Sequence, residues 1–169
     1  MIHTTLKAIR QHGPCKEGWE KLLTTLGKTK ADDEPLPFLT ILESNGLSDA
    51  LWCLRVLPSE MDGPIRLLVC DFAEPALKYT TDPRPAEAIR VARAYARGEA
   101  SKKELSAARA FAYAYAATTA TASADAAAAA AWAASAASSA YAAARSEQTR
   151  IFRAWLDKTE FPIAAGGKK

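Results

Sequence analysis

The side chains that could perform chemistry are few and scattered along this chain of 169 residues. It has two histidines, His3 and His12, and three cysteines, Cys15, Cys53 and Cys70, without a CxxC pair. A zinc site requires four ligands at characteristic spacing, which this distribution does not supply. We therefore expect no bound metal, and three reduced thiols of the kind found in cytoplasmic proteins.

Two of the cysteines, Cys53 and Cys70, are candidates for a nucleophile. Each stands within an apolar stretch, and no histidine that could act as the base is close to either in the sequence. A histidine could still approach them in the fold. We interpret both as core residues and predict no catalytic residue, with a small cysteine-dependent hydrolase or transferase as the enzymatic alternative.

The carboxylates of Asp71 and Glu74 are three residues apart, which puts them on one face of a helix. Such pairs are mostly solvated, and Pro75 beside them indicates the end of a helix. The sequence has no glycine-rich phosphate loop, no GxSxG elbow and no HExxH helix. We therefore expect no cofactor.

The most informative charged feature is basic and lies in residues 83–109, which hold seven basic residues against three acidic ones. Arg90, Arg93 and Arg97 follow the i, i+3, i+7 spacing of one helix face, and Arg84 and Lys102 extend that face. One interpretation is a solvated face with intrahelical ion pairs. The functional hypothesis is that these five residues bind an acidic protein partner. Nucleic acid is the less favoured partner, because a net charge of +3 is a mild excess.

Helices are the elements that must position these side chains. Capping residues at Ser48, Asp62, Asp82 and Ser101 each precede apolar residues at helical spacing, and Glu104 completes a capping box with Ser101. Residues 15–26 have the apolar spacing of an amphipathic helix, with a glycine directly after them as C-cap. No alternating pattern longer than four residues predicts a strand. The sequence therefore predicts an all-α, compact multi-helix domain without a sheet.

Alanine dominates residues 106–145, where it accounts for 24 of 40 positions, and neither glycine nor proline occurs there. Alanine is the best helix former, and its small side chain lets neighbouring helices approach closely. We therefore expect central alanine-rich helices. One helix over residues 102–157 would be roughly 80 Å long, so we predict a break at residues 118–123, with a continuous helix as the alternative. The region is too weakly apolar for a membrane span.

We interpret the chain as a single domain. Its parts are an N-terminal helical segment (1–46), a middle group of helices (47–100), the alanine-rich helices (101–157) and a tail (158–169). Residues 1–5 lack the charged and apolar regions of a secretory signal, so a cytoplasmic location is expected. A dimer is one option for its oligomeric state.

Three segments resemble a known family. They are DALWCLR at residues 49–55, the stretch at residues 66–74, and DPRPAEAIRVARAYARGE at residues 82–99. Followed by an alanine-rich half, they resemble immunity proteins associated with bacterial toxins, the immunity-five-like group, over roughly residues 45–145. The segment CKEGWEKLLTTLG at residues 15–27 resembles proteins of phages and prophages.

The resemblance implies an all-helical fold and binding that neutralises another protein, and it supplies no catalytic residue. Histidines expected in the alanine-rich half are replaced by Tyr113, Trp132 and Tyr141, so any role of those histidines does not carry over. The expected function is a non-enzymatic protein-binding inhibitor that acts by stoichiometric binding to a protein target. It would be either toxin-immunity-like or a phage-encoded inhibitor of host defence of the anti-CRISPR type. A nucleic-acid-binding phage accessory protein is a further alternative.

Overall fold

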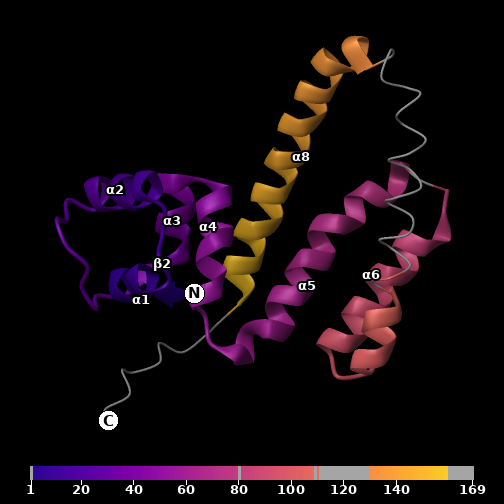
Figure 1. Cartoon of the computed structure of the whole chain (residues 1–169), viewed down its shortest axis with the longest axis horizontal. Coiled ribbons are helices and arrows are strands. Elements are labelled where there is room, and N and C mark those ends of the chain that lie inside the picture. The colour runs from indigo at the N-terminus through magenta and orange to yellow at the C-terminus, as the bar shows by residue number, and fades with distance from the viewer. Residues whose placement is uncertain (1, 80, 109, 111–129, 160–169) are drawn as a thin grey trace. The chain divides into compact units, whose positions relative to one another are not determined.

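The computed structural model describes residues 2–79, 81–108, 110 and 130–159 (Figure 1). Helices dominate these residues, which confirms the predicted all-α class. Contacts divide the chain into two units, residues 1–59 with 148–169 and residues 60–147. None of the helices in the described part of the chain is long and apolar enough to cross a lipid bilayer. The interpretation of the chain as one domain stays a prediction.

The first unit consists of short helices and one small sheet. Its elements are β1 (His3–Thr4), α1 (Leu6–Gln11), α2 (Lys16–Thr25), β2 (Leu36–Pro37), α3 (Phe38–Asn45), α4 (Leu47–Cys53) and the 3-10 helix η1 (Leu54–Val56). The two strands are antiparallel, with His3 opposite Pro37 and Thr4 opposite Leu36. The expectation of no sheet was therefore wrong. Strands of two residues are too short to leave an alternating pattern in the sequence.

The core of the first unit draws on both ends of the chain. Phe38 and Ile41 of α3 are fully buried, and so is Phe152 near the end of α8 (Ala130–Lys158). The residues of α8 from 148 onward belong to this unit. An ion pair of 3.1 Å between Arg153 Nη1 and Glu43 Oε1 joins α8 to α3.

The second unit is built on two helices that lie side by side, α5 (Asp62–Ala73) and α6 (Pro83–Ala96) (Figure 1). The 3-10 helix η2 (Ser59–Met61) precedes α5, and η3 (Glu74–Tyr79) follows it. The α-helix stops two residues before Pro75, as expected for a residue that cannot donate a backbone hydrogen bond. Leu68 and Cys70 of α5 and Val91 of α6 are buried.

Two of the four predicted N-caps are confirmed. The Asp82 carboxylate accepts a hydrogen bond of 2.8 Å from the backbone nitrogen of Arg84. Ser101 and Glu104 form the capping box, because the Ser101 hydroxyl accepts from the Glu104 nitrogen at 3.2 Å and the Glu104 carboxylate accepts from the Ser101 nitrogen at 2.7 Å. Each bond satisfies a backbone donor that has no partner inside its helix.

The other two N-caps were wrong, Ser48 by two positions and Asp62 by one, because the observed N-caps are Gly46 and Met61. Helix α4 begins at Leu47, before Ser48, because Gly46 adopts a φ of 88° and turns the chain directly from α3 into α4. Helix α5 begins at Asp62 itself, which places this carboxylate in the first turn, where the helix dipole favours negative charge.

The glycine predicted to end α2 does so. Gly27 has a φ of 64°, and its nitrogen donates to the carbonyl of Thr24 at 3.1 Å. The nitrogen of Lys28 donates to the carbonyl of Leu23 at 2.9 Å, which completes a Schellman motif. This left-handed conformation suits glycine because it has no Cβ.

The alanine-rich region is described only at its two ends. Residues 102–108 are helical, and α8 begins at Ala130. The predicted break at residues 118–123 lies outside the described residues, so one helix or two stays a prediction.

A candidate binding cavity in the first unit

A cavity of about 110 Å³ lies among the helices of the first unit. Its apolar wall is formed by Ile9, Pro14, Trp19, Leu22, Ile41 and Trp52. A dry cavity of about 150 Å³ can hold a benzene ring. This volume therefore suits a group of roughly five heavy atoms.

The spacing of residues along each helix explains why these side chains converge. On α2, Trp19 and Leu22 are three residues apart, and on α4, Asp49 and Cys53 are four apart. Residues at these spacings lie on the same face of a helix. Each helix therefore presents one face to the cavity.

Asn45 lines the cavity and forms hydrogen bonds with two neighbouring helices. Its Nδ2 donates to the carbonyl of Gly18 in α2 at 2.8 Å and to Asp49 Oδ2 in α4 at 2.8 Å. Its Oδ1 accepts a bond of 2.8 Å from the hydroxyl of Ser44. Both amide hydrogens are therefore used, and the Asp49 carboxylate is held in one orientation.

Gly18 lets the backbone of α2 approach this carboxylate. A Cβ atom at position 18 would lie 2.7 Å from Asp49 Oδ2 and 3.2 Å from Cys15 Sγ. The first distance is too short for any side chain without a displacement of the carboxylate. Gly18 was not among the residues predicted from the sequence, although a glycine inside an amphipathic helix is a signal of close backbone approach.

The cysteines differ in exposure. Cys15 is exposed at the start of α2, whereas Cys53 and Cys70 are buried. Burial raises the pKa of Cys53 to about 12, with the nearby charge of Asp49 as the second cause, and burial also raises the pKa of Cys70. Both thiols therefore stay protonated near neutral pH, as the interpretation of core residues requires. Among the described residues, no group of three or more potential ligands could hold a metal ion.

Two arginines stack on the cavity's tryptophans. The guanidinium of Arg10 lies 5.4 Å from the ring centroid of Trp19, and that of Arg55 lies 4.2 Å from that of Trp52. Arg55 Nε also donates to the backbone carbonyl of Trp52 at 2.9 Å. Cation–π contacts of this kind orient exposed arginines over half-exposed indole rings.

Within the predicted basic face, Arg93 serves an intramolecular role. Its Nη2 lies 2.8 Å from Asp71 Oδ1 and 2.8 Å from Glu74 Oε2, which joins α6 to the end of α5 and to η3. Its side chain is 24% exposed, against 68% for Arg90. The carboxylates of Asp71 and Glu74 are thus the counter-ions of Arg93.

The other residues of the basic face are more exposed. Arg90 pairs with Glu87 of its own helix at 2.6 Å, and Arg84 pairs with Asp82 at 2.6 Å. Arg97 and Lys102 are exposed. Partner binding by this face stays a prediction.

The second unit is electrically balanced, with ten basic and ten acidic residues. The net charge of +3 therefore belongs to the first unit, which has twelve basic and nine acidic residues.

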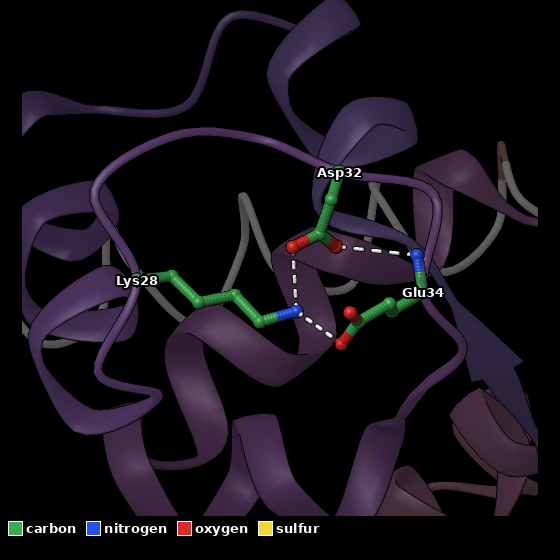
Figure 2. A network of polar contacts seen from close by, with 3 residues as sticks. All are labelled: Lys28, Asp32 and Glu34. Carbon is green, nitrogen blue, oxygen red and sulfur yellow. Dashed lines mark hydrogen bonds and ion pairs between the residues drawn. The ribbon is translucent and has the colours of Figure 1, made fainter.

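An acidic loop in the first unit is neutralised by lysines. Figure 2 shows Lys28 Nζ between Asp32 Oδ2 at 2.5 Å and Glu34 Oε2 at 2.6 Å. Asp32 Oδ1 also accepts from the Glu34 nitrogen at 3.2 Å. Lys7 pairs with Asp33 at 2.9 Å. All three carboxylates of this loop therefore have a cation beside them.

Comparisons of the chain with protein-family models, with curated proteins and with solved structures give no significant match. The resemblance to immunity proteins therefore stays a prediction from the sequence.

Proposed function

We propose that the protein is a non-enzymatic inhibitor that acts by stoichiometric binding to a protein target. The observation that carries this proposal is the cavity beside two half-exposed tryptophans, Trp19 and Trp52, each covered by an arginine. Tryptophan and arginine dominate the residues that supply most of the energy of protein–protein binding, particularly around well-packed pockets. The site therefore has the composition of a binding hot spot.

The chemistry of the cysteines favours this proposal over the enzymatic alternative. A cysteine nucleophile reacts as the thiolate, which the raised pKa values of Cys53 and Cys70 disfavour. Among the described residues that line the cavity, none is a histidine that could activate Cys15. The three free thiols are compatible with action in the cytoplasm, where cysteines are kept reduced.

The kind of inhibitor follows from the sequence resemblance. Residues 82–99 favour either toxin-immunity-like binding or phage-encoded inhibition of host defence. The exposed basic side chains of Arg90, Arg97 and Lys102 on the second unit favour a target with acidic surface regions.

The test is capture of the target followed by measurement of stoichiometry. The tagged chain is incubated with a lysate of the organism that encodes it, and the captured protein is titrated by calorimetry. We expect a one-to-one complex, with binding weakened at least about tenfold by Trp52→Ala, as is usual for a central tryptophan.

Trp155→Ala is the matched control, because Trp155 is a half-buried tryptophan of the same unit that stacks on Phe152 and does not line the cavity. Thermal unfolding checks that both variants remain folded. Failure to recover any stoichiometric protein complex would contradict the proposal. So would a complex that Trp19→Ala and Trp52→Ala leave unchanged.

A further inference from the structure

The cavity combines an apolar wall with one negative charge. Of the described residues that line it, Asp49 alone has a charged side chain, since the remainder are apolar, cysteine, glycine or asparagine. Its carboxylate receives one hydrogen bond, from Asn45, and no lysine or arginine of the described chain lies within ion-pair distance. Asn45, which donates that bond, and Gly18, whose backbone lies close to the carboxylate, line the cavity as well.

The charge of Asp49 affects the pKa of a second residue that lines the cavity, Cys53. At the buried thiol of Cys53, the Asp49 carboxylate raises the pKa more strongly than the Arg55 guanidinium lowers it. At this thiol, the negative charge of Asp49 therefore has a larger effect than the positive charge of Arg55.

We propose that this cavity binds a primary alkylammonium group, presented by the protein partner as a lysine side chain that reaches Asp49 between Trp19 and Trp52. This inference rests on the proposed protein-binding function and names the chemistry that the partner must present. The geometry behind it is the half-buried, cation-free carboxylate in the wall of an otherwise largely apolar cavity.

A lysine side chain matches this site in size and in chemistry. Its four methylenes and one nitrogen are five heavy atoms, about the content of a cavity of this volume. The methylenes pack against Ile9, Leu22 and Ile41, while the indole rings attract the cation. The ammonium then forms a charge-assisted hydrogen bond with the carboxylate that Asn45 holds in place.

The charges around the cavity indicate which residues flank the inserted lysine in the partner. Arg10 and Arg55 are exposed and each stacks on a tryptophan of the wall. A partner with acidic residues on either side of the inserted lysine would therefore meet positive charge outside the cavity and negative charge inside it. Such alternation of charge favours one register of binding over others.

The first experiment uses a small probe and no partner protein. Butylammonium chloride is titrated into the full chain while the indole N–H signals of Trp19 and Trp52 are followed by NMR. We expect saturable shifts of these two signals, and binding about tenfold weaker for 1-butanol, which has the same number of heavy atoms without the charge. Equal binding of 1-butanol and butylammonium would overturn the inference.

Two variants test whether butylammonium binding depends on Asp49. Asp49→Asn keeps the size of the side chain and removes its charge, so butylammonium binding should weaken about tenfold. Glu17→Gln is the matched control, because Glu17 is an exposed acid in the first turn of α2 that does not line the cavity. An unchanged affinity in Asp49→Asn would overturn the inference.

A peptide separates a protein lysine from a free amine. The peptide acetyl-Asp-Lys-Asp-amide should bind more tightly than butylammonium and should lose binding in Asp49→Asn. Binding of butylammonium without binding of the peptide would overturn the lysine assignment.

Failure of the inference can be told apart from failure of the proposed function. A captured partner that Trp52→Ala releases and Asp49→Asn does not would overturn the inference and leave the protein-binding function standing.

Discussion

The backbone of Gly18 lies so close to Asp49 that a Cβ atom at position 18 would be 2.7 Å from the carboxylate oxygen Oδ2. Glycine is a poor choice inside a helix, and alanine there is normally more stable by about 1 kcal/mol. Helix α2 is therefore locally less stable with glycine than with alanine, and the glycine lets α2 approach α4.

This relationship predicts an energetic coupling between the two positions. Gly18→Ala should be less favourable when Asp49 is present than in an Asp49→Ala background, by about 1 kcal/mol of unfolding free energy. The reason is that alanine displaces the carboxylate only where there is one. Urea unfolding of the two single variants and the double variant measures the coupling, and additive effects would contradict it.

The ion pairs of α6 predict different costs for two neighbouring arginines. Arg93→Ala leaves Asp71 and Glu74 without their shared cation and should lower the unfolding free energy by about 1 kcal/mol. Arg90→Ala removes only an exposed pair within its own helix, so its effect should stay within about 0.5 kcal/mol. Thermal unfolding of both variants compares them, and equal effects would show that Arg93 does not join the helices.

The acidic loop predicts a pH dependence of stability. A hydrogen bond from Lys28 holds the pKa of Asp32 below its ordinary value of 3.8. A lowered pKa in the folded state means that this contribution is complete well above pH 3.8 and is lost as the pH falls through the lowered pKa. The unfolding midpoint of the wild type should therefore decline more steeply in acid than that of Lys28→Met.

The contribution of the same lysine should not change at moderately alkaline pH. The hydrogen bond with Asp32 raises the pKa of Lys28 above 10.5, so this contribution is complete below pH 10.5 and is lost as the pH rises through the raised pKa. Lys30→Met is the control for both pH ranges, because Lys30 is an exposed lysine of the same loop. Midpoints that depend on pH identically in Lys28→Met and the wild type would exclude a stabilising role for this network.

The thiols should differ sharply in reactivity. Cys15 is exposed, whereas Cys53 is buried and has its pKa raised to about 12. A disulfide reagent such as DTNB at pH 8 should therefore modify Cys15 rapidly in the folded chain, and Cys53 and Cys70 only on unfolding. Cys15→Ser should abolish the rapid phase, whereas Cys70→Ser should leave it intact. A rapid phase that remains in Cys15→Ser would show that a second cysteine is reactive. That result would support the hypothesis of a cysteine nucleophile.

The features that the sequence determined by itself depend on bonds between near neighbours. Asp82 and Ser101 cap their helices, and Gly27 ends α2, through hydrogen bonds that join residues at most five positions apart. Contacts of this kind depend only on residues that are close together in the sequence. They can therefore form in any fold that contains the same helix. The cap assigned to Ser48 was displaced by two positions and the cap assigned to Asp62 by one, because a tight turn at Gly46 and a 3-10 turn before α5 set those helix starts.

What only the tertiary structure decided is which helix faces meet. Helical spacing put Arg90, Arg93 and Arg97 on one side of α6, but the partner of Arg93 is Asp71, 22 positions earlier on α5. Likewise, Gly18, Asn45 and Asp49 come from three helices, and their convergence depends on how the turns between those helices direct the chain. Local sequence sets the period of each helix, whereas the rotation of one helix against another is set by the packing of all its neighbours.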